Sequence, residues 1–63
     1  MFVIKLRNKD TEELFLVQRG NFAHATTKKE NEATKFDTED DAYELRKKLS
    51  LEVIWDEVKI IKL

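Results

Sequence analysis

The sequence predicts a small α+β domain, with an antiparallel or mixed sheet of three to four strands and one amphipathic helix packed on one face. Two observations point to this class. β-Forming residues gather near both ends of the chain, over 2–7 and 58–63, and residues 38–50 have the spacing and end signals of a helix. A chain of 63 residues buries only roughly 60% of the surface that it exposes when unfolded. We therefore expect a single domain over 1–63, with a small core and the element order β-β-(β)-α-β.

The first strand is expected at 2–7, where side chains of two kinds alternate. Its apolar set is Phe2, Ile4 and Leu6, and the alternating set is Val3, Lys5 and Arg7. Successive side chains of a strand point to opposite faces. This strand therefore has one apolar face and one mostly basic face.

A hairpin is expected next. A polar cluster at 8–12 contains turn-prone Asn and Asp, and it leads to a second run rich in β-formers at 13–19. The second strand has apolar groups on both faces, with Leu14 and Leu16 on one, and Phe15 and Val17 on the other. Such a strand is buried on two sides or takes part in an interface.

The segment after the hairpin has the weakest pattern. Gly20-Asn21 predicts a turn, because both residue types tolerate a positive φ. Over 22–35 we expect a loop with one short helical turn, since Thr27-Lys28-Lys29-Glu30 has capping-box spacing. A very short strand at 34–36 would then bring Phe36 inward.

The clearest signal is a helix within 37–50. Thr38 is a good N-cap, Asp41 stands at the capping-box position, and carboxylates fill the first turn, where they complement the helix dipole. The apolar stripe consists of Ala42, Leu45 and Leu49, and basic residues occupy the last turns. The helix therefore has matched ends and one face for the core.

The last element is expected to be a strand interrupted by a bulge or break at Asp56-Glu57. β-Forming residues flank this acidic step at 53–55 and 58–63. Within this segment Trp55, like Phe22 earlier, is a large apolar residue for which two roles stay open. Each either closes the end of the core or anchors a partner.

One helix covers only one face of such a sheet. The residues assigned to the helix side are Phe2, Ile4, Leu6, Val58 and Ile60. The opposite face combines apolar and basic residues, and exposed patches of this kind often mark a partner site. The second strand adds either Leu14 and Leu16 or Phe15 and Val17 to this face. The residues expected to contact a partner there are Phe15, Val17, Ile61 and Leu63, with Arg7 and Lys59 at the rim.

Single-stranded nucleic-acid binding is the alternative function of the same face. Basic residues around an aromatic platform provide phosphate contacts and base stacking. The residues concerned are Lys5, Arg7, Arg19 and Lys59, around Phe15. Glu13 on the same strand phase and a net charge of −1 act against this alternative.

Composition excludes several kinds of site. Without cysteine there is no disulfide, thiolate metal site or cysteine nucleophile, and a single glycine cannot build a glycine-rich phosphate loop. The longest apolar runs fall far below the ~18 residues of a membrane span, and no signal peptide is recognised at Met1. We therefore expect a cytoplasmic protein.

No set of residues predicts catalysis, a cofactor or a metal. His24 is the only histidine, and Thr26 and Thr27 beside it give little support for a nucleophile and base. The carboxylates at 37–41 lack the spacing of a Ca²⁺ loop, and the helix dipole already accounts for them. The expectation is a non-enzymatic protein with no catalytic or metal-binding residues, no cofactor and no small-molecule substrate.

The string Ala33-x-x-Phe36-x-Thr38-x-x-Asp41-Ala42 joins the predicted short strand to the helix. In this string, preceded by an aromatic residue and a hairpin, the chain resembles small uncharacterised proteins encoded by bacteriophages and prophages of Gram-positive bacteria. The resemblance implies a compact accessory domain of mobile-element origin, and it supplies no site residues. With the uncovered sheet face, it leads us to expect a protein that binds a protein partner or forms a homo-oligomer.

Overall fold

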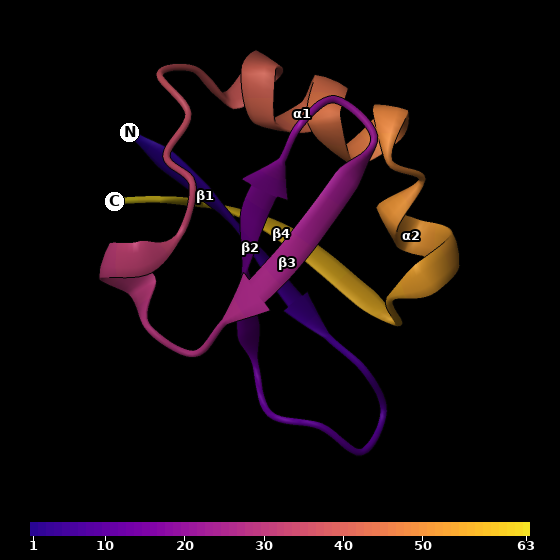
Figure 1. Ribbon diagram of the computed structural model, residues 1–63. Coiled ribbons are helices and arrows are strands. Elements are labelled where there is room, and N and C mark those ends of the chain that lie inside the picture. The colour runs from indigo at the N-terminus through magenta and orange to yellow at the C-terminus, as the bar shows by residue number, and fades with distance from the viewer.

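The computed structural model describes residues 1–63 and contains one sheet with helices on one side (Figure 1). Its elements are β1 (Phe2–Arg7), β2 (Leu14–Arg19), β3 (Ala23–Thr27), the 3₁₀ turn η1 (Glu30–Glu32), α1 (Glu39–Lys48), α2 (Leu51–Ile54) and β4 (Glu57–Lys62). The sheet is antiparallel, with the strand order β3-β2-β1-β4. The predicted α+β class is confirmed, as are the first strand and the hairpin that follows it.

The two middle strands pair over only a short stretch. β1 pairs with β4 along its whole length, and β2 pairs with β3 along the whole of β3. Between β1 and β2, however, only Lys5 opposite Phe15 and Leu6 opposite Leu14 are in register. The sheet therefore consists of two well-paired halves with a narrow junction between them.

The chain just before α1 fills the gap beside this junction. Phe36 exchanges two backbone hydrogen bonds of 2.8 Å with Phe2, and the Thr34 N–H donates to the Leu16 carbonyl at 3.0 Å. The strand expected at 34–36 is thus a single bridge at Phe36. The expected inward position of Phe36 is confirmed, since its side chain belongs to the core.

The structure corrects the expectation of a loop over 22–35, because β3 occupies 23–27. Gly20 has a φ of 73°, so the chain reverses there and β3 returns along β2 from Arg19 opposite Ala23 to Phe15 opposite Thr27. Ala and Thr residues carry no clear alternation, so pairing with β2, not local pattern, makes this segment a strand. The expected helical turn is present as η1.

The predicted helix is confirmed as α1. The Thr38 hydroxyl accepts a hydrogen bond of 3.1 Å from the Asp41 N–H, as an N-cap residue does. Acidic residues occupy the first turn and basic residues the last. The stripe of Ala42, Leu45 and Leu49 is buried in the core.

Residues 51–54 form α2, so the expected strand at 53–55 was wrong, and β4 begins only at Glu57. α1 ends at Lys48, and Ser50, two residues later, has a φ of 52°, the left-handed conformation that commonly follows the end of a helix. This turn carries Leu51 into the core, where it is 0% exposed. The burial of Leu51 outweighs the β propensity of Val53 and Ile54.

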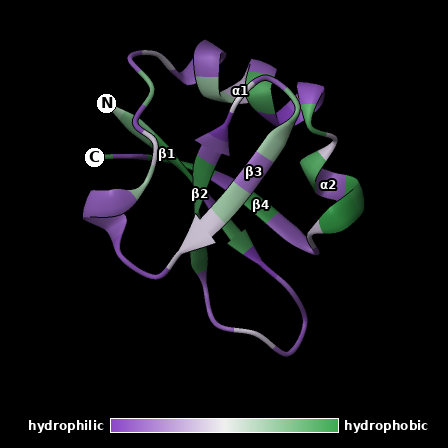
Figure 2. Ribbon diagram, viewed as in Figure 1, coloured by the Kyte–Doolittle hydropathy of each residue, from purple (hydrophilic) through white to green (hydrophobic).

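The core lies between the helices and one face of the sheet. Its buried members are Ile4, Leu6, Leu16, Phe36, Ala42, Leu45, Leu49 and Leu51, and Phe2, Trp55, Val58 and Ile60 pack against them. All residues assigned to the helix side from the sequence are thus in or against the core. Figure 2 shows hydrophobic segments on β1 and β2, the two middle strands of the sheet.

Candidate binding surface

The strand registers define the sheet face turned away from the helices, here called the open face. Cross-strand partners share a face, and none of the residues on this face belongs to the core cluster. The open face consists of Val3, Lys5, Arg7, Phe15, Val17, Arg19, Ala23, Ala25, Thr27, Glu57, Lys59 and Ile61. It brings together every residue expected to bind a partner or a nucleic acid except Leu63, which follows β4.

The apolar part of the open face is more closed than a bare sheet surface. Val3 is 0% exposed although it does not belong to the core between the helices and the sheet. Phe15, Val17 and Ile61 are half-buried. Leu63 is 46% exposed. The face therefore offers a partly accessible apolar strip with a more exposed end.

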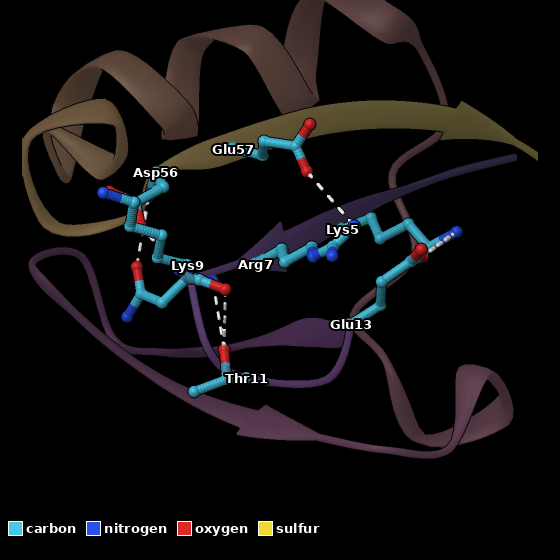
Figure 3. A network of polar contacts seen from close by, with 8 residues as sticks. Lys5, Arg7, Lys9, Thr11, Glu13, Asp56 and Glu57 are labelled. Carbon is cyan, nitrogen blue, oxygen red and sulfur yellow. Dashed lines mark hydrogen bonds and ion pairs between the residues drawn. The ribbon is translucent and has the colours of Figure 1, made fainter.

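The cations of the open face differ in their ionic partners. Lys5 forms an ion pair with Glu13, and the Lys5 ammonium, with further positive charge nearby, holds the pKa of the Glu13 carboxyl below its usual value. Arg7 Nη1 lies 3.8 Å from Glu57 Oε2 (Figure 3). Lys59 has no ion-pair partner.

Arg19, at the end of β2, is likewise exposed and unpaired. Four cations therefore share this face with Glu13 and Glu57. The positive charge expected from the sequence is present, but these two carboxylates partly neutralise it. The positive charge that no carboxylate pairs with lies at Lys59 and Arg19.

A polar network fixes the loop after β1 to the turn before β4 (Figure 3). The Asp56 carboxylate accepts a hydrogen bond of 2.6 Å from the Lys9 N–H, and the Asp56 N–H donates to Asn8 Oδ1 at 3.1 Å. Thr11 Oγ1 accepts from the Asn8 N–H at 3.0 Å. Nothing in the sequence signals this network, because its two sides lie far apart along the chain.

The Asp56→Ala variant should lower the free energy of unfolding by about 1–2 kcal/mol, because it removes a charged acceptor of the Lys9 N–H. Denaturant unfolding followed by circular dichroism measures this change. Asp10→Ala is the matched control: it removes a carboxylate from the same loop that forms no hydrogen bond or ion pair. We expect the control to change stability by less than about 0.5 kcal/mol; equal losses in the two variants would contradict the role of Asp56.

Three hollows mark the surface, and none is an enclosed cavity. The hollow on the open face, beside Lys5 and Glu13, holds about 10 Å³, roughly the minimum for one water. A second, of about 310 Å³, lies at the polar network. The largest, of about 690 Å³, is a groove between α1 and the chain around Phe36. Its lining includes Lys35, Lys47 and Lys48 and as many carboxylates, so it has no net charge to attract a charged ligand.

His24 and Trp55 contact each other across the core side of the sheet. The Trp55 indole N–H donates to His24 Nε2 at 3.2 Å, and the two rings meet edge to face. Trp55 therefore closes the core. Phe22, in contrast, is 79% exposed, with the Lys48 ammonium 5.6 Å from its ring centre. Trp55 thus has the first of the two roles considered for these aromatics, closing the core, whereas Phe22 is accessible for the second, contact with a partner.

Comparisons with protein-family models, with curated proteins and with solved structures find no match for this chain. No group of three or more His, Asp or Glu side chains is placed to hold a metal ion. None of the helices is both long and apolar enough to cross a membrane. The geometry of the surface is thus the basis for a functional proposal.

Proposed function

We propose that this chain is a non-enzymatic accessory protein that binds a protein partner through the open face. The observation that carries the proposal is the one-sided packing of the fold. Both helices lie on the core side, while Phe15, Val17 and Ile61 stay partly accessible on the other side. The hollow within this face holds about 10 Å³, and the hollow of about 310 Å³ lies at its end, beside the polar network, so a ligand on the apolar strip meets a nearly flat surface, as proteins do in their complexes.

The charges of the open face suggest the chemistry of the partner. Lys59 and Arg19 are exposed without ion-pair partners, and they stand beside the apolar strip. Complementary charge at the rim of an interface increases the association rate and selects the partner. The proposed partner therefore has an apolar centre bordered by carboxylates.

A bacteriophage or prophage origin is part of this proposal, and its support is the string from Ala33 to Ala42. Each named position in the string has a structural role: Ala33, Phe36 and Ala42 are buried, and Thr38 caps α1 through the Asp41 N–H. Such a string specifies how the chain enters the helix. It is thus consistent with a shared fold among small accessory proteins and carries no chemistry of its own.

Charge reversal on one strand tests the proposal. Lys59→Glu changes the open face, and Lys62→Glu makes the same change on the other face of β4, so the second variant is a matched control. The wild type and the two variants are each used to retain proteins from a host lysate. A protein that binds the wild type and Lys62→Glu, but not Lys59→Glu, is identified and purified, and its affinity for each of the three is measured by titration. We expect Lys59→Glu to weaken binding by on the order of 10-fold. Equal retention by both variants would contradict binding through the open face.

Nucleic acid is the other outcome that this surface allows. A titration with single-stranded oligothymidylate at low salt reports it directly. Binding that weakens steeply with salt, and that Lys5→Glu or Arg7→Glu reduces, would replace the protein partner with a nucleic acid. The ion pairs of Lys5 with Glu13 and of Arg7 with Glu57 favour the protein partner.

A further inference from the structure

The two edges of the sheet differ in how they are protected from pairing with another strand. Edge strands commonly carry charged residues, which prevent such pairing. β4 has Glu57, Lys59 and Lys62, and both helices contact it. β3, at the other edge, reads Ala-His-Ala-Thr-Thr and contains no acidic residue, lysine, arginine or proline. The edge at β3 is the less protected one.

The backbone of β3 has hydrogen-bonding groups available at this edge. The Leu16 carbonyl and the Gln18 N–H bond to Thr34, on the side of β2 away from β3. By alternation, Ala23, Ala25 and Thr27 bond to β2, and the N–H and C=O groups of His24 and Thr26 point outward. Neither residue has a backbone hydrogen bond outside the ladders, and Thr26 is exposed.

We propose that β3 pairs with β3 of a second copy of this chain, antiparallel about a two-fold axis, with Ala25 opposite Ala25 of the partner. This register overlaps the strands completely, placing Ala23 opposite Thr27 and joining the outward groups of His24 to those of Thr26. No charged residue faces another within the overlap. Just beyond it, the exposed Phe22 lies opposite Lys28, whose ammonium forms an ion pair with Glu12 of its own chain.

The small side chain of Ala25 is what suits β3 to this arrangement. Residues opposite each other at a non-hydrogen-bonded position have the shortest separation in an antiparallel ladder, with Cα atoms about 4.5 Å apart. Ala25 lies on the open face, so the pairing would join the open faces of two copies into one surface. The pairing uses the edge of the sheet and is independent of what binds the open face.

A charge swap at the two-fold axis tests the pairing. Ala25→Lys or Ala25→Glu places two like charges directly opposite each other, so each variant alone should have a dimer dissociation constant raised about fivefold or more. An equimolar mixture of the two variants should form a heterodimer at least as stable as the wild-type dimer. Sedimentation equilibrium of the single and mixed variants measures this, and heterodimer formation also shows that both variants are folded.

Matched controls are Glu44→Gln and Lys62→Gln, which change the net charge by the same amounts on α1 and β4 and should leave dimerisation unchanged. Amide hydrogen exchange of the wild type provides a second readout. The His24 and Thr26 amides should become protected as concentration rises, whereas the Ala25 amide is protected at all concentrations. A protein that stays monomeric at millimolar concentration, or a dimer that instead protects the Val58 and Ile60 amides, would overturn the proposal.

Discussion

Truncation of Leu51 to alanine should lower the free energy of unfolding by about 2–5 kcal/mol, the range for removing a large aliphatic side chain from a core. Leu51 has no exposed surface, and it belongs to a core cluster whose other members come from the sheet, from Phe36 and from α1 and its C-cap. Since a small domain has only a narrow margin of stability, a loss of this size should leave much of the protein unfolded at room temperature. Thermal and urea unfolding of the variant measure the effect.

Val53→Ala is the control for Leu51→Ala, because both residues lie in α2 but the side chain of Val53 is 82% exposed. The control should change the unfolding free energy by less than about 0.5 kcal/mol. The pair of variants also distinguishes α2 from a strand at 53–55, in which Val53 would pack against neighbours. A large loss for Val53→Ala with a small one for Leu51→Ala would refute the packing described for α2.

The Trp55→Ala variant should have the second large effect, a loss of about 2–4 kcal/mol in unfolding free energy. The indole is half-buried against the core and donates to His24, which lies in β3, while β4 begins shortly after Trp55. β3 and β4 are the opposite edges of the sheet, so this contact connects one edge strand, β3, to the end of α2, which leads into the other. Equilibrium denaturation measures the loss.

Trp55→Phe separates packing from hydrogen bonding at this position. It keeps an aromatic ring but removes the indole N–H, so it should cost less than Trp55→Ala, with about 1 kcal/mol of its effect due to the hydrogen bond. His24→Phe in the Trp55→Phe background should then add little further loss. If Trp55→Phe were as damaging as Trp55→Ala, the hydrogen bond to His24 would dominate and the packing account would fail.

The sequence was sufficient for elements whose pattern is local. β1 alternates except at Val3, and α1 has a cap, an apolar stripe and charged ends, so both could be predicted with their approximate bounds. β3 could not, because Ala and Thr residues between a turn and a polar loop become a strand only through pairing with β2. α2 was missed for the opposite reason. Val53 and Ile54 have high β propensity, but the burial of Leu51 decides the local structure.

The candidate surface was only partly accessible to sequence reasoning. Alternation along each strand grouped Phe15 with Val17 and Lys59 with Ile61, and the strand registers place these two pairs on the same face. Their degree of burial could not be predicted, because it depends on how neighbouring strands curve and pack. Strand alternation already indicated that Glu13 opposes the positive charge of this face, as its ion pair with Lys5 shows. The network at Asp56 and the unprotected edge at β3, in contrast, depend on long-range contacts or on strand order, for which a single sequence provides no signal.

The long ladder between β1 and β4 has a consequence for the kinetics of folding. It joins the first and last segments of the chain, and beyond it the Leu63 N–H donates to the Met1 carbonyl at 2.9 Å. During synthesis, β1 has no partner for this edge until β4 has left the ribosome. Contacts between distant segments also slow the folding of small domains. The nascent chain is therefore most open to mispairing while this edge of β1 is exposed.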